Sequence, residues 1–128
     1  THLKVQERVS KWRAEGGAVV SVCPEELGAL GTPRPPCDLS GGDGADFWAG
    51  QSKVLSRSDR QDHSSGFRRG AERALRLAEG CDRAILKARS PSCGCGETWI
   101  EGLVQRGDGV FAAGLRAQGI PLETEEDL

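Results

Sequence analysis

Hydrophobic positions recur along the chain with two spacings, one typical of amphipathic helices and one typical of short buried strands. Apolar residues on one face and charged residues on the other predict three helices: residues 4–14, residues 66–79 and a segment that Asp108 caps and Gly119 ends. Aliphatic runs bounded by loop residues predict strands at 18–22, 83–88 and 120–122, with a weaker candidate at 51–57.

Two segments lack a clear period. Residues 23–44 are rich in proline and glycine, which predicts a long loop, with a short helix over 25–30 because Pro24 suits a first helical position. Residues 97–104 fit either a β-hairpin or an irregular excursion, and residues 124–127 predict a terminal helical turn. A loop as long as 23–44 is usually functional or disordered, and its stiff prolines favour a functional loop.

The alternation of strand and helix predicts an α/β fold. We expect a three-layer sandwich around a small, mostly parallel, Rossmann-like sheet. The 128 residues suffice for one domain with a single core, spanning 1–128. The chain contains no Met and begins at Thr1, so we expect it to be an N-terminally truncated fragment or a processed product.

The charge of the chain limits the classes of partner that it can bind. The net charge is −2, which leaves no broad basic surface for DNA, although four arginines between residues 68 and 76 can form a local patch. No apolar run approaches the roughly 20 residues of a membrane helix, so no membrane partner is expected. A small substrate fits this composition best.

Five cysteines carry the candidate chemistry. Cys23 and Cys93 each follow a predicted strand, and the carboxyl ends of parallel strands share one edge of a sheet. Two thiols at one edge are suited to an iron–sulfur cluster, although an unpaired cysteine is more often a small buried residue. The odd number and open spacing of the cysteines favour a reducing, cytoplasmic setting.

Other polar residues have two interpretations each. Glu25 either handles protons near Cys23 or complements the dipole of a helix start, and Ser90 either faces the cysteines or is a turn residue before Pro91. Residues 107–109 either bind an anion through helix amides or simply cap the helix. Cys81 is expected to be structural, and Cys37 to be a bystander or a spare ligand.

Six motifs in a fixed order provide a resemblance. They are Val22-Cys23-Pro24-Glu25, Gly31-Thr32-Pro33-Arg34-Pro35-Pro36, Gly41-Gly42-Asp43-Gly44, Ile85-Leu86-Lys87, Ser90-Pro91-Ser92-Cys93-Gly94 and Gly107-Asp108-Gly109-Val110. Together they resemble the small bacterial family represented by thiouracil desulfidase, formerly a domain of unknown function. The resemblance runs from near residue 12 to the C-terminus.

The resemblance implies a four-iron, four-sulfur cluster held by three cysteines, with the fourth iron open. Cys23 and Cys93 correspond to two of these ligands. The third family cysteine lies in an N-terminal strand-and-loop segment that would precede Thr1, so the sheet is expected to lack its N-terminal strand. Cys37 and Cys95 are the alternative third ligands within this sequence.

The implied activity is removal of sulfur without net redox change. The open iron binds the sulfur of a thiolated nucleobase or nucleotide such as thiouracil, water attacks the carbon, and sulfide is released. Glu25 would activate water or shuttle protons, and Ser90 would position the substrate or the proton path. A tRNA substrate stays open, and so does a different class of function: a non-catalytic accessory or sensor module that holds a metal or cluster.

Overall fold

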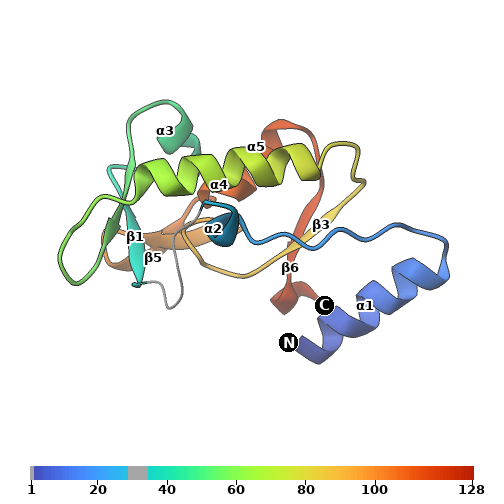
Figure 1. Ribbon diagram of the computed structural model, residues 1–128. Coiled ribbons are helices and arrows are strands. Elements are labelled where there is room, and N and C mark those ends of the chain that lie inside the picture. The colour runs from blue at the N-terminus through green and yellow to red at the C-terminus, as the bar shows by residue number, and fades with distance from the viewer. Residues whose placement is uncertain (1, 29–34) are drawn as a thin grey trace.

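The computed structural model describes residues 2–28 and 35–128. Its described residues form five α-helices, six strands and a final 3-10 helix (Figure 1). In chain order they are α1 (His2–Ala14), α2 (Pro24–Leu27), β1 (Cys37–Ser40), α3 (Gly44–Trp48), β2 (Lys53–Ser56), α4 (Ser64–Leu77), β3 (Ala84–Leu86), β4 (Glu97–Ile100), β5 (Leu103–Arg106), α5 (Val110–Ala117), β6 (Leu122–Thr124) and η1 (Glu125–Asp127).

The strands of the described residues form two small sheets. The larger has the order β2-β1-β4-β5, with antiparallel pairs at both ends and a parallel contact between β1 and β4, where Leu39 faces Ile100. The smaller pairs β3 with β6 in parallel. The α/β class is therefore confirmed, while parallel and antiparallel pairs are mixed and the three-layer arrangement stays a prediction.

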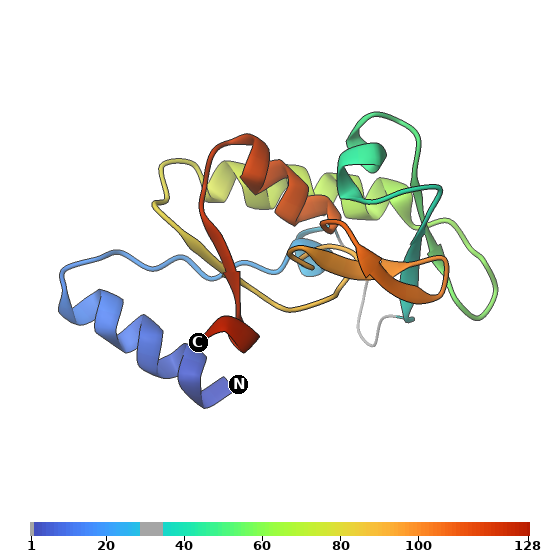
Figure 2. The ribbon, with the colours of Figure 1, turned by 180° about the vertical axis from the view of Figure 1, so that it is seen from behind.

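One core lies between the four-stranded sheet and the helices α4 and α5, which run together on one side of it (Figure 2). The α4 face at Phe67, Ala71 and Ala74 is almost fully buried, as its helical spacing predicts. From the sheet, Leu39 and Val54 meet this face and are completely buried. None of the helices in the described residues is both long and apolar enough to cross a membrane.

The predicted strand at 18–22 is wrong. These residues are extended but pair with no strand of the described chain, and Val20 is 54% exposed. A strand needs a neighbour to satisfy its backbone groups, and β3 pairs with β6. Helix α1 before it, predicted at 4–14, is confirmed, and Lys4 Nζ bonds the Leu128 carbonyl near the adjoining termini (Figures 1 and 2).

The predicted loop at 23–44 is only partly a loop, since it contains β1 and the start of α3. Helix α3 begins with a capping box in which Asp43 and Asp46 each accept the other's backbone N–H, a signal that the sequence carried in Asp-x-x-Asp. The short helix expected at 25–30 is α2 and ends at Leu27, and its predicted last residues lie outside the described ones.

The strand expected at 120–122 is displaced, since β6 is Leu122–Thr124; the other boundaries are closer to the predictions. Residues 97–104 belong to a β-hairpin of β4 and β5 that extends to Arg106, and the terminal turn is η1. Helix α4 begins at Ser64, ahead of the predicted start. The expected cap by Asp108 is wrong, because Gly109 is the N-cap of α5 and makes no side-chain bond.

Candidate active site

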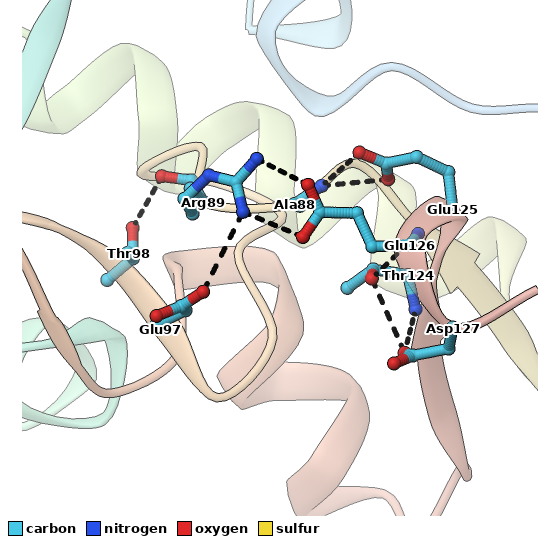
Figure 3. Close-up of polar contacts among 8 residues, drawn as sticks. All are labelled: Ala88, Arg89, Glu97, Thr98, Thr124, Glu125, Glu126 and Asp127. Atoms are coloured by element: carbon cyan, nitrogen blue, oxygen red, sulfur yellow. Dashed lines mark hydrogen bonds and ion pairs between the residues drawn. The ribbon is translucent and has the colours of Figure 1, made fainter. Parts of the chain in front are cut away.

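The loop between β3 and β4, residues 87–96, carries Cys93 and is called the cysteine loop. Its first residues are tied to the C-terminal turn η1 (Figure 3). Arg89 forms a two-pronged ion pair with Glu126, and the Ala88 amide donates to the carboxylate of Glu125 at 2.9 Å. These contacts anchor the loop where it leaves the smaller sheet.

The N-terminus of α5 holds the middle of the cysteine loop. The Val110 amide donates to the Pro91 carbonyl at 2.8 Å, and the amides of Phe111 and Ala112 donate to the Ser92 carbonyl at 2.8 and 3.1 Å. These amides would attract an anion at a free helix end, but here protein carbonyls use them. The structure therefore favours an architectural role for residues 107–109 over anion binding.

Ser90 shapes the turn that presents Cys93. Its hydroxyl oxygen accepts the Cys93 amide at 2.8 Å, and its carbonyl accepts both the Gly94 amide at 2.8 Å and the Thr98 hydroxyl at 2.9 Å. The turn interpretation of Ser90 is thus observed. Its hydroxyl hydrogen is not used in the bond from the Cys93 amide, so a second role toward the cysteines is compatible with this geometry.

Helix α2 places Cys23 and Glu25. Cys23 is the N-cap residue, and Pro24 opens the helix as expected. The helix end is held to α4, where the side chains of Arg69 and Arg73 donate to the carbonyls of Gly28 and Leu27. Cys23 is therefore positioned by packing of α2 on α4, because no strand precedes it.

The pKa of the Cys93 thiol depends on the groups that surround it. The pKa of the Cys93 thiol is raised to about 11, mainly by desolvation and also by the negative charges of Glu25 and Cys23. The hydroxyls of Ser92 and Ser90 act in the opposite direction. The distant segment at α2 thus brings Cys23 and Glu25 within interaction range of Cys93, beside Ser90 of the cysteine loop.

Cys37, at the start of β1, lies beside the same group. Desolvation raises the pKa of its thiol to about 11, helped by the charges of Glu25 and Asp38. Its sulfur donates to the Pro35 carbonyl at 3.4 Å. Glu25 is thus within electrostatic reach of both Cys37 and Cys93.

The other cysteines have different surroundings. The Cys95 sulfur is 3.4 Å from Arg116 Nη2, and Arg116 also pairs with Asp108 at 2.6 Å. Cys81, like Cys37, Cys93 and Cys95, is partly buried against the hydrophobic core. Across residues 2–28 and 35–128, no three His, Cys, Asp or Glu side chains form a group that could hold a metal ion. The third cluster ligand stays a prediction.

Two features escaped the sequence interpretation. Ser92 is 1% exposed and its hydroxyl makes no hydrogen bond of normal geometry within the described residues, although it directly precedes Cys93. Its place in the Ser-Pro-Ser-Cys motif was the available signal. The second feature is a cavity of about 490 Å³ between α3, α4 and α5, lined by Trp48, Leu75 and Gly114 among others and by none of the cysteines.

Comparison with known proteins places the chain in a family. A model of the 2-thiouracil desulfurase family matches residues 1–127. The uncharacterized protein YbbK of Bacillus subtilis is 35% identical over 127 residues, 95% of this chain and 83% of the relative. A solved structure of the [4Fe-4S]-dependent thiouracil desulfidase TudS aligns with a TM-score of 0.73 and 38% identity, over 94% of this chain and 75% of that one. Sequence and fold agree, and this chain belongs to the 2-thiouracil desulfurase family.

Proposed function

We propose that the chain is an iron–sulfur-dependent enzyme that removes sulfur from thiouracil or related thiolated nucleobases and nucleotides. The observation that carries this proposal is the gathering of Cys23, Glu25 and Ser90 around Cys93. The 38% identity to a [4Fe-4S]-dependent thiouracil desulfidase supports it. Five cysteines without a disulfide are consistent with a reducing, cytoplasmic setting.

The residues fit two of the three ligand positions of a four-iron cluster. Cys23 and Cys93 offer soft thiolate donors from separate segments that lie within electrostatic reach of each other. For the third ligand we retain the prediction of a cysteine upstream of Thr1. Within the described residues Cys37 is the better-placed substitute, because Cys95 is engaged by Arg116.

With three thiolate ligands, the cluster would supply one iron free of protein side chains, a Lewis acid suited to a thiocarbonyl sulfur. Glu25 would take a proton from the attacking water and return it to the leaving sulfur. The Ser90 hydroxyl would orient the substrate or relay that proton. The water oxygen becomes the carbonyl oxygen and sulfur leaves as hydrogen sulfide, so no external oxidant or reductant is needed.

The test uses the full-length protein, because the expected third ligand lies upstream of Thr1, reconstituted with iron and sulfide under anaerobic conditions. We expect bound iron and sulfide release from 2-thiouracil, and the loss of both in Cys23→Ala and Cys93→Ala. Cys81→Ala is the matched control, because Cys81 packs against the core outside this group, and it should retain both. A Cys93→Ala variant that still binds iron and releases sulfide would contradict the proposal.

Glu25→Gln separates proton handling from cluster binding. We expect this variant to retain iron and lose sulfide release, since its side chain keeps its shape and cannot accept a proton. Parallel assays with the free base, the nucleotide and thiolated tRNA would identify the substrate. Stoichiometric zinc without iron in anaerobically purified protein would instead favour the non-catalytic accessory or sensor module.

A further inference from the structure

The hollow of about 490 Å³ between α3, α4 and α5 lies apart from the cysteines, none of which lines it. Its walls are apolar, with Trp48 from α3, Leu75 from α4, and Ala113 and Gly114 from α5. The Trp48 indole N–H already donates to the Val110 carbonyl at 2.8 Å, so the ring is the part of this side chain left for a further contact. Hollows with aromatic and small apolar walls are common binding sites, and Trp is enriched in protein–protein interfaces.

The side of α4 that borders the hollow carries charges of alternating sign. Arg68, Glu72 and Arg76 are spaced four residues apart, and Glu79 follows three residues later, just after the helix, so the four lie along one side. All four are exposed, and Glu72 and Arg76 line the hollow itself. None of the four forms an ion pair within the described residues. Along the helix the order is therefore positive, negative, positive, negative.

This order of charges is complementary to itself when two copies of α4 lie antiparallel. In that arrangement Glu72 faces Arg76 of the second copy, and Arg68 faces Glu79 within one residue of the same register. Two-fold symmetry then repeats each pair. A parallel arrangement would instead oppose like charges at each of these positions, which is unfavourable.

The same arrangement fills the hollow. Because α4 is one wall of its own hollow, α4 of each copy can lie beside α3 and α5 of the other. The small side chains of Ala113 and Gly114 allow a further helix to approach α5 closely. The methylene stem of Arg76 from the second copy can cover the Trp48 ring while its guanidinium reaches Glu72.

We infer that this face is a two-fold interface between two copies of the chain, in which the α4 helices are antiparallel and Glu72 and Arg76 pair reciprocally. Exposed ion pairs contribute little each, so the apolar contact supplies most of the stability and the charges set the orientation. The inference goes beyond the proposed function and does not depend on it, because the hollow contains no cysteine.

The experiment measures the mass of the full-length protein in solution by sedimentation velocity and light scattering. We expect a two-chain mass for the wild type and a dissociation constant raised about tenfold or more in Glu72→Arg, which places like charges opposite each other in both copies. Adding Arg76→Glu to this variant restores opposite charges, and the double variant should dimerise like the wild type. Glu7→Arg, the same change on the exposed side of α1, is the matched control and should leave the mass unchanged (Figure 1).

Three outcomes would overturn the inference. A wild-type protein with a one-chain mass at every concentration up to about 100 µM would leave the hollow to a different occupant, such as a small aromatic ligand. A dimer that Glu72→Arg leaves intact would place the interface on another face. A double variant that is folded by circular dichroism and still has a one-chain mass would exclude the reciprocal pairing of Glu72 and Arg76.

Discussion

Replacing Gly70 with alanine tests whether packing between α2 and α4 sets the geometry of the cysteine site. A Cβ at residue 70 would lie 1.7 Å from the Pro24 carbonyl oxygen and 2.8 Å from the Gly28 amide nitrogen. Real Cβ atoms essentially never lie within 3.0 Å of another heavy atom. To bring the contact from 1.7 Å to 3.0 Å, α2 and α4 must separate by about 1.3 Å. The atoms in the way belong to the backbone, so no side-chain rotation relieves the contact.

The cost to stability should be small compared with the effect on the site. Overpacking costs about 1–3 kcal/mol, and the higher helix propensity of alanine returns about 1 kcal/mol. We therefore expect a net loss of about 0–2 kcal/mol and a Tm lowered by at most roughly 10 °C. A binding constellation tolerates only about 0.5 Å of displacement, so a shift of α2 that carries Cys23 away from Cys93 exceeds this tolerance.

The assay is iron content after anaerobic reconstitution, with circular dichroism to confirm folding. Gly70→Ala should be folded and hold several-fold less iron than the wild type. Glu72→Ala, on the exposed side of the same helix, is the matched control and should bind iron normally. A Gly70→Ala protein with wild-type iron content and unchanged Tm would refute the argument that α2 is seated at this glycine.

Two further predictions concern charges. In the apo-protein, Glu25→Gln should increase alkylation of Cys37 by iodoacetamide by about 2- to 5-fold, since removing a nearby negative charge favours the thiolate. Mass spectrometry should show no change at Cys95, whose pKa is raised mainly by desolvation and whose charged neighbours are Arg116 and Asp108. Burial alone would raise the pKa of Asp108, but the bonds from Arg116 and the Gly96 amide hold it below its usual 3.8. This stabilisation is present above pH 3.8 and is lost as the pH falls further. Asp108→Asn should therefore lower the free energy of unfolding by about 0.5–1 kcal/mol at pH 7, and by less below pH 3.8. A difference between wild type and variant that grows at low pH would contradict this assignment.

Local side-chain spacing accounts for the elements that were predicted correctly. The apolar positions Phe67, Ala71 and Ala74 recur at helical intervals, and they form the buried face of α4. The aliphatic run before the cysteine loop became β3, at Ala84–Leu86. In these segments the side chains that define the pattern are the ones that enter the core, so the pattern alone was sufficient.

The strands that were misjudged depend on their neighbours. Residues 18–22 have a strand-like composition, yet they find no partner in the described chain, and Val20 stays exposed. β1 contains Cys37 and Asp38 and shows no strong β pattern, but β2 pairs with its whole length and β4 contacts its other side. Backbone pairing across the sheet, which no local window contains, decided both cases.

The cysteine site likewise combines features that the sequence predicted with features that only the tertiary structure decided. The proposal that Cys23 and Cys93 hold a cluster followed from these two residues and the motifs around them. The expected route, two thiols at the ends of parallel strands, was wrong for Cys23, which reaches Cys93 because α2 lies on Gly70 of α4. The burial of Ser92, whose carbonyl accepts two amides of α5, was also not predicted from the sequence. Residue identity specifies the available chemistry, whereas the approach of distant groups depends on backbone contacts between helices and loops far apart in the chain.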